Sequence, residues 1–188
     1  MTERVQYVPG PAGGAQMQKR EGRNWTLIVV RELRHRPEKV WQALTEPAHL
    51  REWAPFDADG SLGGVGNTVK LTTVGAPMPH ITETTVTRAD APRMLEYTWG
   101  ENEMRWELEP IGDGTRLTLW TSINRHFIAM GAAGWHICFD VLDHLLAGQP
   151  MGRPVGPETR KLPGFRRLQA EYAKLFGVQT PGRTPNDA

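Results

Sequence analysis

The segment from Met94 to Ile123, which indicates the fold most clearly, reads MLEYTWGENEMRWELEPIGDGTRLTLWTSI. Three segments of it, 94–99, 103–109 and 115–123, alternate apolar and polar side chains, as strands with one packed and one wet face do. In 103–109 every even position is apolar and every odd position is charged. The tripeptide Gly112-Asp113-Gly114 is a hairpin signal. The stretch therefore predicts neighbouring antiparallel strands.

More strands are expected upstream. Segments 68–74 and 81–88 also alternate, and Asp90-Ala91-Pro92 marks a turn before Met94. Residues 25–33 are rich in apolar and β-branched side chains, which indicates a strand covered on both faces. The glycines of 57–67 predict turns around a short edge strand.

Proline and glycine mark the helix ends. Pro37 fits a first helical turn, and that helix is expected to end before Pro47. A second short helix is expected at 48–53, before Pro55. The longest helical pattern, 129–147, ends at Gly148. Its apolar stripe should cover the sheet; the stripe consists of Trp135, Phe139, Leu142 and Leu146. A connector, 149–164, leads to an amphipathic helix at 165–176.

The ends of the chain are expected to lie outside the packed unit. Residues 1–23 contain Pro and Gly but no long apolar run, so we expect a flexible N-terminal tail without an export signal. Residues 178–188 lack apolar periodicity and are expected to form a C-terminal tail. Residues 24–177 are expected to form a single domain.

Composition excludes several classes of function. Lys plus Arg number 22 against 21 Asp plus Glu, so no strong field favours nucleic acid or an anionic membrane. The single cysteine, Cys138, cannot form an internal disulfide, and no Cys/His cluster of a zinc site is present. We therefore expect a cytoplasmic protein with no cofactor and no metal.

Several segments together match a known pattern. They are VWQALT at 40–45, APRMLEYTW at 91–99, WELEP at 106–110, GTRLTL at 114–119, GWH at 134–136, LAG at 146–148 and LQAEYAKLFG at 168–177. This set resembles the START-like (SRPBCC) superfamily, and within it the branch of the C-terminal domain of the activator of heat-shock protein 90 ATPase. The resemblance implies an α+β helix-grip fold, as in the birch-pollen allergen, with a curved antiparallel sheet wrapped around a long C-terminal helix. Residues 120–131 depart from the pattern, so the cavity mouth is expected to differ.

The resemblance also implies a cavity between the sheet and the long helix that suits an apolar or aromatic small molecule. Inward positions on the predicted strands and helix supply candidate lining residues, although the same aromatic side chains would equally fill an ordinary core. Trp53 and Phe56, beside Pro55, are expected to form a mobile lip. The complete set of predicted ligand-binding residues is Tyr97, Trp99, Trp106, Leu119, Trp135, Phe139, Leu142, Trp53 and Phe56.

Ionisable groups allow further interpretations. His136, Asp140 and His144 are spaced by four, which suits either metal ligation or a solvated polar stripe; we favour the stripe. A strand register shifted by one residue would point His80, Glu83, Glu96 and Arg105 inward for acid–base work. In the favoured register Glu96, Arg105 and Glu107 form a solvent-facing charge network. No catalytic residue is assigned.

The expected function is binding of a hydrophobic small molecule without transforming it. One alternative is a cyclase- or hydrolase-like enzyme that uses the same cavity, which would need an ionisable group at the cavity floor. The other is a co-chaperone-like domain that binds a protein partner, including a chaperone, through the outer face of the sheet.

Overall fold

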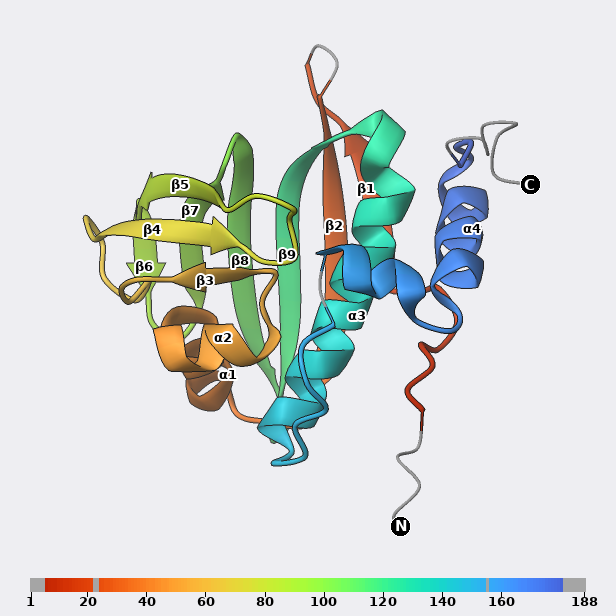
Figure 1. Ribbon diagram of the computed structural model, residues 1–188. Coiled ribbons are helices and arrows are strands. Elements are labelled where there is room, and N and C mark those ends of the chain that lie inside the picture. The colour runs from red at the N-terminus through yellow and green to blue at the C-terminus, as the bar shows by residue number, and fades with distance from the viewer. Residues whose placement is uncertain (1–5, 22–23, 155, 181–188) are drawn as a thin grey trace.

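The computed structural model describes residues 6–21, 24–154 and 156–180. A six-stranded antiparallel sheet in the order β1-β2-β9-β8-β7-β6 curves around a long helix, α3 (Ile128–Leu146) (Figure 1). Its strands are β1 (Ala15–Lys19), β2 (Asn24–Leu33), β6 (Arg88–Asp90), β7 (Met94–Trp99), β8 (Asn102–Ile111) and β9 (Gly114–Asn124). This arrangement confirms the predicted α+β helix-grip fold.

A second, three-stranded sheet and the short helices flank one end of the main sheet (Figure 1). The sheet consists of β3 (Phe56–Ala58), β4 (Thr68–Thr73) and β5 (His80–Thr85). The remaining elements are α1 (Pro37–Thr45), α2 (Pro47–Trp53), α4 (Phe165–Phe176) and the 3-10 helices η1 (Arg125–Phe127) and η2 (Gly156–Lys161). Both α1 and α2 carry proline in the first turn, where its missing N–H costs no helical hydrogen bond.

The register of the central strands confirms the predicted faces. Trp106 of β8 pairs with Leu119 of β9, and both side chains are buried against α3. One position along, Arg105 pairs with Trp120 on the outer face, where the guanidinium lies 4.9 Å from the centre of the indole. The period of two thus separates a packed inner face from a polar outer face.

Helix α3 approaches the sheet closely at Gly131. A Cβ at this position would lie 2.5 Å from Cδ1 of Ile123 on β9, which is too close for real side chains. Glycine therefore lets the first turns of α3 reach the sheet, while the stripe from Trp135 to Leu146 packs on its inner face. The expected role of that stripe as cover for the sheet is confirmed.

The N-terminal segment differs from the expected tail. Ala15–Lys19 form β1, which pairs with β2 from Ala15↔Val29 to Lys19↔Trp25. Met17 packs against the core from this strand. The alternation of apolar and polar residues in 15–19 therefore indicates a strand, although the Pro and Gly residues before it suggest a tail. Gly14 precedes the strand with a φ of +66°, and a Cβ there would meet the Val30 carbonyl oxygen at 2.6 Å. Residues 1–5, 22–23 and 181–188 of the expected tails lie outside the described residues.

One predicted strand, 81–88, is divided between the two sheets. β5 ends at Thr85 and pairs with β4, whereas β6 begins at Arg88 and pairs with β7. Between them the Val86 amide donates to the Asn67 carbonyl, which turns the chain from the small sheet into the large one. A continuous alternation of side chains cannot reveal this change of partner, because both sheets impose the same period.

The inner and outer tryptophans should differ in their contribution to stability. Replacing the fully buried Trp106 with alanine (W106A) is expected to lower the free energy of unfolding by about 3–5 kcal/mol, because a large cavity opens in the core. The matched change Trp120→Ala on the outer face should cost about 1–2 kcal/mol. Urea denaturation followed by circular dichroism measures both. Equal losses would contradict the assignment of faces.

Candidate functional site

An apolar pocket of about 510 Å³ lies beside the first half of α3. One wall is α3 itself, the opposite wall comes from the ends of β4 and β7 and the loop after β4, and η2 with the start of α4 closes a third side. We call it the α3 pocket. Its lining residues are Pro55, Thr73, Val74, Pro77, Trp99, Met130, Gly131, Gly134, Trp135, Cys138, Thr159, Arg160 and Phe165.

Gly134 explains why this wall of the helix is open. A Cβ at Gly134 would meet no atom within 4 Å, so the residue borders empty space rather than packed side chains. Glycine inside a helix costs about 1 kcal/mol relative to alanine. Unlike Gly131, which permits a close contact, Gly134 contributes nothing to packing and leaves volume in the pocket.

The polar groups of the lining are few and mostly satisfied. The indole N–H of Trp99 donates to the Thr73 hydroxyl at 3.1 Å. Burial raises the pKa of the Cys138 thiol to about 12, so the thiol stays protonated at neutral pH and behaves as an apolar group. The lining as described contains no carboxylate and no histidine. The α3 pocket therefore suits an apolar or aromatic molecule, and the acid–base group that catalysis would need is not part of that lining.

The pocket brings together two of the predicted ligand-binding residues, Trp99 and Trp135, whose rings meet edge to face at 6.2 Å. The others lie outside this lining. They are buried in the core between the sheet and the helices and comprise Tyr97, Trp106, Leu119, Phe139, Leu142, Trp53 and Phe56. The centre of the sheet–helix interface is thus filled, and the open volume lies at its edge.

Trp53 and Phe56 do not form the expected lip. Each is only 1% exposed: the Trp53 indole donates to the Ala43 carbonyl at 2.8 Å, and Phe56 packs edge to face on Tyr97. The exposed edge of the pocket comes instead from the loop after β4, which contributes Val74 and Pro77 to the lining and whose Met78 is 77% exposed. The prediction is wrong because α2 and β3 fold inward over the sheet, a long-range packing that neighbouring sequence does not encode.

One feature of the sequence indicates the position of the α3 pocket, although most of its lining residues were not predicted. Gly131 and Gly134 interrupt an otherwise strong helical pattern within four residues, which marks a helix face with a special requirement for space. Thr159, Arg160 and Phe165 come from η2 and α4, and nothing local in the connector 149–164 indicates that it folds back onto α3.

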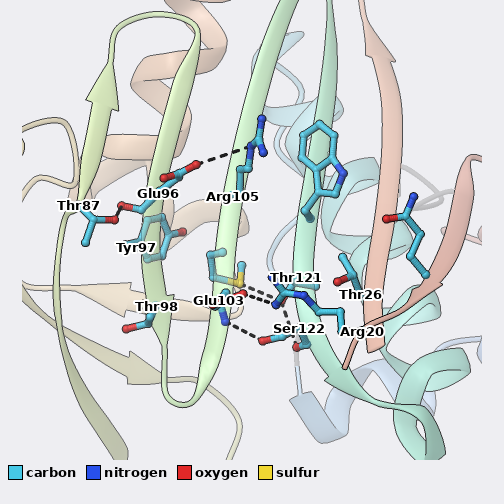
Figure 2. Close-up of a pocket in the computed structure, with 13 residues that line it drawn as sticks. Arg20, Thr26, Thr87, Glu96, Tyr97, Thr98, Glu103, Arg105, Thr121 and Ser122 are labelled. Atoms are coloured by element: carbon cyan, nitrogen blue, oxygen red, sulfur yellow. Dashed lines mark hydrogen bonds and ion pairs between the residues drawn. The ribbon is translucent and has the colours of Figure 1, made fainter. Parts of the chain in front are cut away.

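A second hollow, of about 620 Å³, lies on the outer face of the main sheet and is lined by several charged side chains (Figure 2). We call it the outer groove; its lining includes Arg20, Glu96, Glu103, Arg105 and Trp120. Its charges pair with each other, since Arg105 reaches Glu96 at 3.7 Å and Arg20 bridges to Glu103. The predicted solvent-facing charge network is therefore present, and these groups are not aimed into an apolar cavity.

His136 and Asp140 lie in neither the α3 pocket nor the outer groove. They lie where α3 contacts α4 and the N-terminal segment. Tyr172 of α4 donates its hydroxyl to the Gly13 carbonyl at 2.9 Å, so its oxygen is free to accept from His136 Nδ1 at 2.8 Å. Asp140 accepts from Tyr7 and from Arg31. His144 is exposed and lies apart.

This arrangement replaces the expected solvated stripe with a buried polar cluster. Among the residues that the structure describes, no group of three His, Cys, Asp or Glu side chains is close enough to hold a metal ion. Desolvation lowers the pKa of His136 below its ordinary 6.5, and the attraction of Asp140, whose Oδ2 lies 3.6 Å from Nε2, only partly opposes it. His136 is therefore neutral at pH 7, and the cluster anchors the N-terminal segment.

Within the described ranges, 6–21, 24–154 and 156–180, the molecule shows no helix long and apolar enough to cross a membrane.

Comparisons with known proteins agree with this fold. A family model described as Activator of Hsp90 ATPase homolog 1-like protein matches residues 34–147. The structure resembles CalU16 from Micromonospora echinospora, with 20% identity over 87% of this chain and 94% of that one and a TM-score of 0.60. It also resembles EF2215, a conserved protein of unknown function from Enterococcus faecalis, with 20% identity, 88% and 92% coverage and a TM-score of 0.63.

A third structure, the protein encoded by BPP1335 from Bordetella parapertussis, is 22% identical over 98% of this chain and all 100% of that one, with a TM-score of 0.60. Identities of this size carry the fold alone. None of the curated proteins compared with the chain matches it.

The burial of neutral His136 should make the protein less stable in mild acid. Because its pKa is lower in the folded than in the unfolded chain, the unfolded chain binds the proton first as the pH falls below about 6.5. The free energy of unfolding should then fall by about 1.4 kcal/mol per pH unit until the folded pKa is reached. Urea titrations between pH 7.5 and 5 should show a shallower loss for His136→Gln than for the wild type.

The exposed His144 on the same helix supplies the control. His144→Gln should keep the pH dependence of the wild type. A His136→Gln variant with an unchanged pH slope would show that His136 does not titrate in a buried site.

Proposed function

The chain belongs to the Activator of Hsp90 ATPase homolog 1-like protein family, and we propose that it binds a hydrophobic or aromatic small molecule in the α3 pocket without transforming it. The single observation that carries this proposal is an open apolar volume of about 510 Å³ next to Gly134 in an otherwise tightly packed interior. Small-molecule sites are typically concave, mostly apolar and of this size.

The aromatic rings of the lining favour a flat or extended apolar ligand. Trp99, Trp135 and Phe165 come from β7, α3 and α4, so a ligand would contact three elements that are distant in sequence. Burying apolar surface against them is worth about 25 cal/mol for each Å². Trp99 and Trp135 would also report binding through their fluorescence.

The alternatives have less support. A cyclase- or hydrolase-like enzyme would need an ionisable group in the pocket, and its described lining offers only the protonated Cys138 and the cation Arg160. A co-chaperone-like role would use the outer face of the sheet, where the charges of Arg105, Glu96 and Glu107 already satisfy one another. We therefore place the ligand, rather than a protein partner, first.

A cytoplasmic location is part of the proposal. Cys138 is a buried free thiol, and the described residues hold no disulfide, so folding does not depend on an oxidising compartment. Neither nucleic acid nor a membrane is proposed as a partner, because the near-neutral charge balance of 22 basic against 21 acidic residues provides no electrostatic attraction to either.

Filling the pocket at Gly134 should abolish binding while the fold is retained. Purified protein would be titrated with fatty acids, flavonoids, sterols and aromatic polyketides, with tryptophan fluorescence and thermal melting as readouts. A ligand of the native state should change the fluorescence saturably and raise the melting temperature by several degrees. Gly134→Leu should weaken that ligand about tenfold or more, since its side chain takes the ligand's space.

Gly134→Ala is the matched control. It adds only a Cβ that meets no atom within 4 Å and should stabilise α3 by about 1 kcal/mol while binding persists. Silence of the folded wild type across the whole panel, or equal binding by Gly134→Leu, would contradict the proposed function.

A further inference from the structure

The α3 pocket has one charged group, and its position restricts the chemistry of the ligand. Arg160, in η2, is the single charged side chain among the described lining residues. Its Nη2 donates to Sδ of Met130, on the α3 wall of the pocket, at 3.6 Å. The thioether is a weak acceptor, so this contact holds the guanidinium at the pocket without neutralising it.

Two acidic groups that are close in sequence to lining residues are already paired with other cations. Glu158, two residues earlier in η2, pairs with Lys161 at 2.7 Å. Asp57, beside the pocket residue Pro55 in sequence, pairs with Arg153 at 2.7 Å. Among the residues that the structure describes, no carboxylate forms an ion pair with Arg160. An arginine at the edge of an apolar pocket thus keeps its charge and its planar set of donors for another partner.

The Thr73 hydroxyl adds a second hydrogen-bond donor to the lining. It accepts from the Trp99 indole at 3.1 Å, so its own hydrogen can be donated to a ligand oxygen. With Arg160 and Thr73 as donors and no carboxylate among the described lining residues, the polar part of the pocket complements an anion and repels a cation.

We propose that the ligand is an amphiphilic anion: an apolar, aromatic or chain-like body that packs against Trp99, Trp135 and Phe165, and one carboxylate that pairs with Arg160. This inference rests on the proposed function and adds to it the chemical class of the ligand. An arginine fork and a carboxylate match in a bidentate pair, and at an exposed rim both partners keep part of their hydration. The carboxylate would therefore orient the ligand, whereas the apolar contacts would supply most of the affinity.

Three compounds with one ring system and three head groups test this class. Isothermal titration calorimetry would compare 2-naphthylacetate, 2-(2-naphthyl)ethanol and 2-(2-naphthyl)ethylamine at pH 7.5. The acid should bind about fivefold more tightly than the alcohol, and the amine more weakly than both. An acid that binds no better than the alcohol would overturn the anionic preference and leave the proposed function standing. Failure of all three compounds to bind would overturn the proposed ligand class.

Variants of Arg160 distinguish the contribution of its charge to ligand affinity from the contribution of the pocket's shape. Arg160→Gln should bring the acid to the affinity of the alcohol and leave the alcohol within about twofold of its wild-type value, whereas Arg160→Lys should keep part of the preference. Arg51→Gln, which removes an exposed charge from α2 outside the pocket, should change neither compound. An Arg160→Gln variant that keeps the full preference for the acid would overturn the role of this residue. Equal losses for the acid and the alcohol would do so as well.

Discussion

The packing of Trp106 against Trp53 and Trp135 holds the main sheet and the helices α2 and α3 together. Its ring, on β8, lies 6.0 Å from Trp53 of α2 and 5.6 Å from Trp135 of α3, nearly perpendicular to both. Its indole N–H donates to the Tyr97 hydroxyl at 3.1 Å, so the polar edge is satisfied inside the core. One side chain thus joins the sheet to both helices and fills the space where a central cavity would otherwise lie.

The position of the α3 pocket follows from that filled centre. Trp135 contacts Trp106 on one side and Trp99 on the other, so it marks the boundary between packed core and open volume. Beyond it α3 carries Gly131 and Gly134; the first lets the helix approach Ile123, and the second leaves space unfilled. The connector and η2 then close the open side and bring Arg160 to an otherwise apolar lining. The packed core and the pocket therefore share a continuous set of aromatic contacts through Trp135.

The sequence predicts the helices and strands of this fold better than it predicts which of their side chains border the pocket. Alternation in 94–123 and the Pro and Gly positions identified most strands and helices, because those signals are local. The distinction between core and pocket aromatics is not local: Trp99 and Trp106 both occupy inward positions, and only the distant residues Gly134 and Phe165 determine which one borders open space. The burial of His136 likewise depends on Tyr172, 36 positions away in the chain.

An NMR titration of protein labelled with carbon-13 at the methionine methyl groups, with 2-naphthylacetate as the ligand, tests directly whether the ligand binds in the α3 pocket. Met130 lines the α3 pocket, whereas Met104 is buried on β8 in the core. Binding in the α3 pocket predicts intermolecular nuclear Overhauser effects to the Met130 methyl group and none to that of Met104. Contacts to Met104, or a response confined to methionines outside the pocket, would contradict it.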